Sequence, residues 1–62
     1  MQELKNLIFA IMYNYGGFYA NDTRAKLKHL SGGEYGHTET HIKLCGITAT
    51  VEEYQTWVKS QS

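Results

Sequence analysis

The apolar periodicity of residues 3–15, ELKNLIFAIMYNY, constrains the fold of this chain more than any other feature. Apolar side chains recur there at intervals of three and four residues, which places them on one face of an α-helix. They are Leu4, Leu7, Ile8, Ile11, Met12 and Tyr15. Two glycines at 16–17 follow directly, and glycine readily adopts the left-handed conformation that ends helices. The pattern predicts an N-terminal helix whose apolar face enters a core.

Phe9 and Tyr13 widen the apolar surface of this helix beyond a single stripe. Two interpretations stay open. Both residues belong to the core, or they provide a second contact surface, which would allow a homodimer through the N-terminal helix.

A second helix is predicted at the C-terminus. Thr50 and Glu53 have the spacing of a capping box, in which each side chain bonds the backbone amide of the other. An apolar stripe of about three helical turns then follows. It consists of Val51, Tyr54, Trp57 and Val58.

Between the helices, residues 24–30 and 38–46 alternate apolar and polar side chains on either side of the glycine-rich stretch 31–36. Alternation predicts strands, and the glycines predict a turn, so we expect an antiparallel hairpin in which Lys28 lies opposite Glu39. Residues 18–20 can add a short third strand, and Gly46 a bulge. An alternative for the first strand is a short helix capped by Asp22.

These elements predict an α+β fold in a single domain, 1–62, with both helices on one face of a two- or three-stranded antiparallel sheet. The hairpin 24–30/38–46 then has a second face open to solvent. We expect this face to carry the charged and histidine side chains of the hairpin. They are Arg24, Lys26, Lys28, Glu39, His41 and Lys43.

The length of 62 residues leaves a marginal core, and Cys45, the sole cysteine, can form no disulfide within the chain. Stability must then come from good packing or self-association. A free cysteine fits a reducing, cytoplasmic setting. The longest apolar run, residues 7–13, is far shorter than the roughly 20 residues that span a bilayer, so no membrane partner is expected.

The charge balance argues against two partner classes and leaves a nucleic acid possible but not favoured. Six basic and six acidic residues give no net charge. General nucleic-acid binding needs an excess of Lys and Arg, and a DNA mimic needs an excess of acid.

The residues His37, His41 and Cys45 are spaced by four, which invites a metal site. On a strand, positions four apart are separated by about 13 Å, too far for the roughly 2.0–2.3 Å bonds of one zinc ion. A helix would permit the site. With strands preferred, we predict no metal, no cofactor and no catalytic group, and hence no enzyme.

Residues 44–51 resemble the turn of helix-turn-helix proteins, with a glycine, an apolar residue and a threonine ahead of a helix. This resemblance implies an alternative function, a small DNA-binding regulator. Glu52 and Glu53 would, however, stand at the front of the recognition helix and repel phosphate.

Five tyrosines and one tryptophan favour a protein-binding module, because such side chains anchor interfaces. In size and neutrality the chain resembles small phage or mobile-element accessory proteins, anti-CRISPR proteins among them, which act as stoichiometric inhibitors or adaptors of host proteins. The resemblance rests on these general properties and on no family motif. The predicted partner-binding residues lie in and beside the hairpin. They are Tyr19, Arg24, Lys26, Lys28, Tyr35, His37, Glu39, His41 and Lys43.

Overall fold

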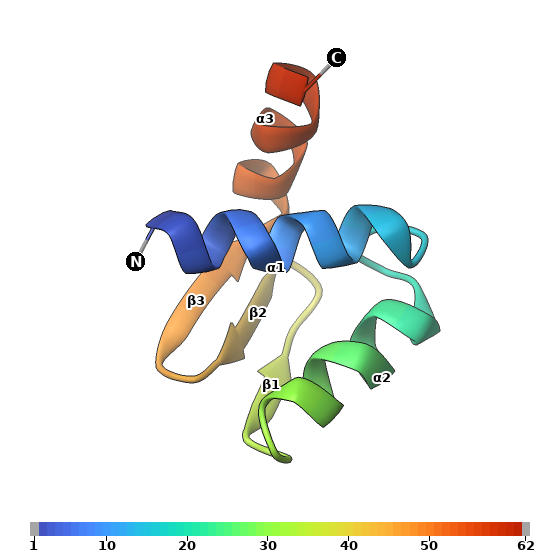
Figure 1. Cartoon of the computed structure of the whole chain (residues 1–62), viewed down its shortest axis with the longest axis vertical. Helices are drawn as coiled ribbons and strands as arrows, with labels where there is room; N and C mark the ends of the chain where they lie inside the picture. The colour runs from blue at the N-terminus through green and yellow to red at the C-terminus, as the bar shows by residue number, and fades with distance from the viewer. Residues whose placement is uncertain (1, 62) are drawn as a thin grey trace.

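A computed structural model describes residues 2–61 and confirms the α+β class. Three helices and a three-stranded antiparallel sheet form one compact body (Figure 1). In chain order the elements are α1 (Gln2–Asn14), α2 (Asn21–Leu30), β1 (Tyr35–His37), β2 (His41–Leu44), β3 (Ile47–Thr50) and α3 (Val51–Gln61). The predicted N-terminal and C-terminal helices are both present.

Helix α1 ends where the glycine pair predicts. The Gly17 amide donates a hydrogen bond to the Met12 carbonyl at 2.6 Å, and Gly16 has a φ of 107°. This is the closing bond of a Schellman motif, which requires a left-handed residue just after the helix.

The prediction of a strand at 24–30 is wrong, because these residues belong to α2. Thr23 and Leu27 are four residues apart and share one helical face, where both are completely buried. The Thr23 hydroxyl donates to the Met12 carbonyl of α1 at 3.4 Å, so the polar group is satisfied inside the core. The helix begins after Ala20, which has extended backbone angles, and Asp22 lies in the first turn rather than at the cap.

Two further expectations about this part of the chain are also wrong. Lys28 does not lie opposite Glu39, and residues 18–20 form no strand, since they connect α1 to α2. The first strand of the sheet is instead β1, whose first two residues come from the stretch 31–36 that was predicted as a turn. It pairs with β2 so that Tyr35 lies opposite Leu44 and His37 opposite Ile42.

The second hairpin joins β2 to β3 through two residues, Cys45 and Gly46. Their φ angles are 52° and 75°, and two positive values are typical of a type I′ turn. The predicted bulge at Gly46 is therefore a hairpin turn. It keeps Leu44 opposite Ile47, so the apolar side chains of both strands stay on one face.

The core lies between that sheet face and the helices. Its buried side chains come from α1, α2, β2 and β3, and one comes from the connection between α1 and α2. They are Ile8, Phe9, Met12, Phe18, Leu27, Ile42, Leu44, Ile47 and Ala49. The α3 residues Val51, Tyr54 and Trp57 pack against this cluster as predicted.

The buried face of α1 is rotated from the predicted stripe. Phe9 is 2% exposed and belongs to the core, whereas Leu4 and Leu7 are 40% and 55% exposed. Helix α3 covers the Phe9 side of α1: the Phe9 ring centroid lies 6.0 Å from that of Tyr54 and 6.1 Å from that of Trp57. The opposite side of α1 is left open.

Candidate docking surfaces

Several predicted contact residues lie on α2, on β1 or in the segments next to them. We call this surface the α2–β1 seam, and its members are Tyr19, Arg24, Tyr35, His37 and Glu39. At one end of the seam, the Tyr19 hydroxyl donates a hydrogen bond to the Glu39 carbonyl at 3.0 Å. This bond ties the connection before α2 to the turn after β1, while the Tyr19 side chain stays 57% exposed.

The middle of the seam is formed by Arg24, Tyr35 and His37. The Tyr35 and His37 rings lie 5.6 Å apart with a 40° tilt. Burial raises the pKa of the Tyr35 hydroxyl above its ordinary value, and the nearby positive charge of Arg24 opposes that rise. The seam thus combines a partly covered tyrosine and an exposed histidine with a cation.

Two polar atoms of the seam are buried without a hydrogen-bond partner among the described residues, the Nε of Arg24 and the hydroxyl of Tyr35. A buried polar group without a partner costs about 1–3 kcal/mol.

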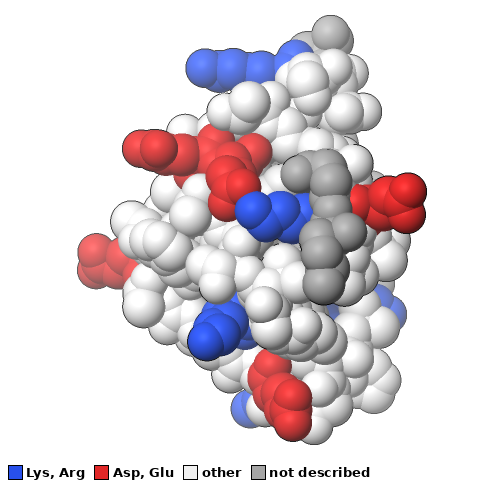
Figure 2. All heavy atoms as spheres, turned by 90° about the vertical axis from the view of Figure 1, so that its left-hand side faces the viewer, with Lys and Arg blue, Asp and Glu red and all other residues white. Residues whose placement is uncertain are grey.

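The other predicted residues lie elsewhere, and the expected single charged sheet face is wrong. The Lys26 ammonium sits 6.0 Å from the Tyr15 ring centroid, and Lys28 is exposed on α2. His41 and Lys43 lie on the open face of β2, where the Thr40 hydroxyl is 2.7 Å from the Nδ1 of His41. Figure 2 shows basic and acidic side chains scattered over the face in view rather than gathered by sign.

A second surface was missed by the sequence patterns. We call it the apolar strip and define it as Leu4, Leu7 and Ile11 of α1 with Leu30 of α2. Leu30 is 52% exposed. The strip borders a groove of about 210 Å³ that continues to Cys45 at the β2–β3 turn. The leucines of α1 were counted as core residues, and no pattern within α1 distinguishes a covered leucine from an open one.

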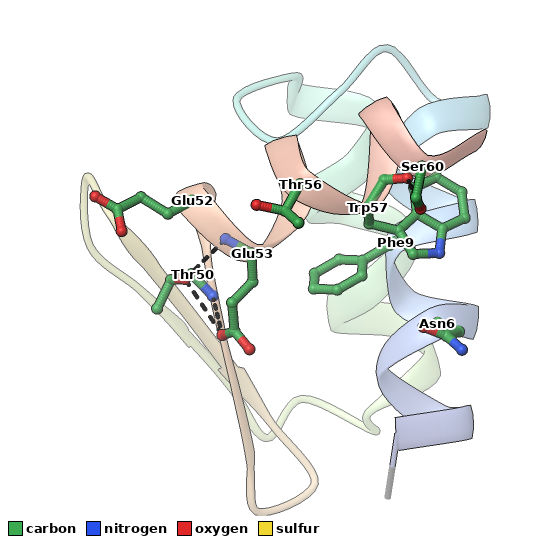
Figure 3. A pocket seen from close by; sticks show the side chains of 8 residues that line it. All are labelled: Asn6, Phe9, Thr50, Glu52, Glu53, Thr56, Trp57 and Ser60. Carbon is green, nitrogen blue, oxygen red and sulfur yellow. Dashed lines mark hydrogen bonds between the residues drawn. The ribbon is translucent and has the colours of Figure 1, made fainter. Parts of the chain in front are cut away.

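A hollow of about 480 Å³ lies between α1 and α3 (Figure 3). Phe9 and Trp57 form its apolar wall, and Glu52 and Glu53 are among its polar lining residues. The Glu53 carboxylate accepts hydrogen bonds from the Thr50 amide and hydroxyl, both at 3.2 Å, and pairs with Lys5.

Those contacts keep the Glu53 carboxylate, at the edge of the hollow, in a structural role. The hydrogen bond from Lys5 is the main cause that lowers the pKa of Glu53, and Thr50 adds to it, whereas partial burial opposes it. A carboxylate held ionised by a cap and an ion pair serves structure rather than proton transfer. The hollow shows no arrangement for general acid–base chemistry among its lining residues.

The candidate metal residues are separated by the sheet. His37 ends β1, His41 begins β2, and Cys45 follows the far end of β2. Within residues 2–61, no three His, Cys, Asp or Glu side chains are grouped so that they could hold a metal ion.

The helix-turn-helix arrangement around Gly46 is also wrong. The elements before and after this turn are the paired strands β2 and β3, whereas a helix-turn-helix motif needs a helix before its turn.

Comparison of the chain with protein-family models, curated proteins and solved structures gives no match. Over the described part of the chain, the helices are too short or too polar to cross a bilayer.

Proposed function

We propose that this chain is a small non-enzymatic module that binds a protein partner through the α2–β1 seam. The observation that supports this most is the convergence of predicted contact residues from separate segments. The Tyr19 hydroxyl bonds the Glu39 carbonyl, the Tyr35 and His37 rings lie 5.6 Å apart, and the charge of Arg24 acts on the Tyr35 hydroxyl. Tyrosine and arginine are enriched among residues that dominate binding energy, which suits this composition.

A protein fits the seam better than a nucleic acid does. The chain has no net charge, and the seam itself contains both Arg24 and Glu39. A phosphate backbone needs a surface of one sign, whereas a folded protein offers mixed charges and backbone groups. We therefore propose a stoichiometric inhibitor or adaptor of a host protein, in the style of phage accessory proteins, acting in the cytoplasm.

The test is capture of a partner with matched variants. A tagged chain should retain one stoichiometric protein from lysate after nuclease treatment. Tyr19→Ser, which removes an exposed seam ring, should abolish retention, as should His37→Ala. Tyr13→Ser is the control, because Tyr13 is 63% exposed but contacts Trp57 of α3, away from the seam.

Two results would contradict the proposal. If the seam variants and the control retain the partner equally, the seam is not the docking surface. If nucleic acid alone is recovered, the chain is a DNA-binding regulator, and Lys26→Ala and Lys28→Ala should then flatten the salt dependence of that binding.

A further inference from the structure

The apolar strip of α1 and α2 has no cover within the described chain. Leu4, Leu7 and Leu30 remain 40%, 55% and 52% exposed. The groove beside them is lined by aliphatic side chains and Cys45. Scattered exposed leucines are ordinary, but leucines that border one groove mark a surface for contact.

Opposite charges stand at the two ends of this strip. Glu3 is exposed in the first turn of α1, next to Leu4. At the other end, Lys26 lies over the ring of Tyr15, which follows α1 directly. At 1.5 Å per residue these ends are about 18 Å apart. The remaining charge on α1, Lys5, is paired with Glu53 on the side that faces α3.

This pattern is self-complementary. A surface with an acid at one end, a base at the other and leucines between them matches a copy of itself turned by half a rotation. A partner of one charge sign would be repelled at one end, and no charge has to be buried in the middle.

We propose that the apolar strip is covered by a second copy of this chain, with α1 antiparallel to α1 across a two-fold axis. Leu7 of each copy then contacts Ile11 of the other, and Glu3 of each lies beside Lys26 of the other. The contact is isologous, so it closes at two copies and leaves both α2–β1 seams open.

The small size of the chain limits the contact area and hence the expected affinity of the dimer. A standard interface buries about 800 Å² per partner, roughly a fifth of this chain's accessible surface of 4198 Å². A contact through one helix of about 20 Å and a flanking residue is at the lower end of that class. We expect a dissociation constant on the order of 10–100 µM.

Sedimentation equilibrium from about 10 µM to about 1 mM tests the dimer. The wild-type mass should rise towards twice the monomer mass, and Leu7→Glu should weaken association at least about 100-fold, because each dimer would bury two unpaired carboxylates. Tyr13→Glu is the control, since it places the same charge on an exposed ring of α1 away from the strip; it should weaken association less than about threefold. Circular dichroism checks that both variants keep their helices.

Charge exchange tests the antiparallel arrangement. Glu3→Lys and Lys26→Glu should each weaken association about 3- to 10-fold, and the double variant should restore it. A monomeric wild type at about 1 mM overturns the proposal, as does a Leu7→Glu variant that associates like the wild type. A double variant as weak as its parents overturns the antiparallel pairing.

The experiments can contradict the dimer without contradicting the proposed function, and the reverse. Partner capture measured on Leu7→Glu should survive, because the seam is intact in the monomer. If the wild type is monomeric and Leu7→Glu loses a captured protein, the strip binds a foreign partner and the second copy is excluded.

Discussion

The two sides of α1 carry similar apolar residues and have different neighbours. On one side, Ile8, Phe9 and Met12 are at most 3% exposed, in contact with the sheet, α2 and α3. On the other side, Leu4 and Leu7 are about half open to solvent. The apolar arc of α1 is wider than the described part of the chain covers, and the difference separates residues that fold the chain from residues that are available to a partner.

The largest effect is expected on the core side. Met12→Ala should lower the free energy of unfolding by about 2–5 kcal/mol, because a fully buried side chain leaves a cavity between α1 and the sheet. Urea unfolding followed by circular dichroism measures it. A loss below about 1 kcal/mol would mean that this side is loosely packed and that the comparison fails.

Next in size is the cap that holds α3 against the core side. Thr50→Ala should cost about 1 kcal/mol, since the Glu53 amide loses its bond to the Thr50 hydroxyl at 3.1 Å. The melting temperature should fall by about 4–8 °C. Thr48→Ala on the open face of the same strand is the matched control and should change it little. Equal falls in melting temperature for the two variants would contradict a stabilising role of the cap.

Lowering the pH should weaken the contact that the Lys5–Glu53 pair makes between α1 and α3. Because the pKa of Glu53 is lowered in the fold, its contribution to stability is present above the ordinary value of 4.5 and is lost as pH falls through the folded pKa. Melting temperatures from about pH 6 to about pH 3 should fall more steeply for the wild type than for Glu53→Gln. Glu52→Gln, which leaves the cap intact, should follow the wild type, and parallel curves for all three would contradict the role of Glu53.

The smallest effect is expected on the open side. Leu7→Ser should change the stability of the dilute chain by no more than about 0.5 kcal/mol, because more than half of the side chain already meets water. Urea unfolding at low protein concentration checks this value. A loss close to that of Met12→Ala would place Leu7 in the core.

Local signals predicted α1, its glycine stop and the capping box of α3. For the glycine stop and the capping box, the residues that carry the signal also make the contact, as in the mutual bonds of Thr50 and Glu53. A helix at α2 was only the alternative to a strand, because its buried face contains a threonine. Thr23 was not counted as a core residue, so a helix over these positions looked too polar to pack.

The surfaces depended on contacts that no local pattern contains. The α2–β1 seam exists because Tyr19 reaches Glu39, twenty residues further along the chain. The apolar strip exists because α3 covers the Phe9 side of α1 and nothing in the described chain covers the Leu7 side. The helical period showed which residues are apolar, whereas only the packed structure showed which of them are covered.

Melting temperature as a function of protein concentration tests the division of α1 most directly. A dimer that binds only the folded chain makes the melting temperature of the wild type rise with concentration. We predict that rise for the wild type, no rise for Leu7→Ser, and melting temperatures within about 2–4 °C of each other at the lowest concentration. A lower melting temperature for Leu7→Ser at every concentration, with no dependence on concentration in the wild type, would contradict the account, because Leu7 would then serve the fold and not a second copy.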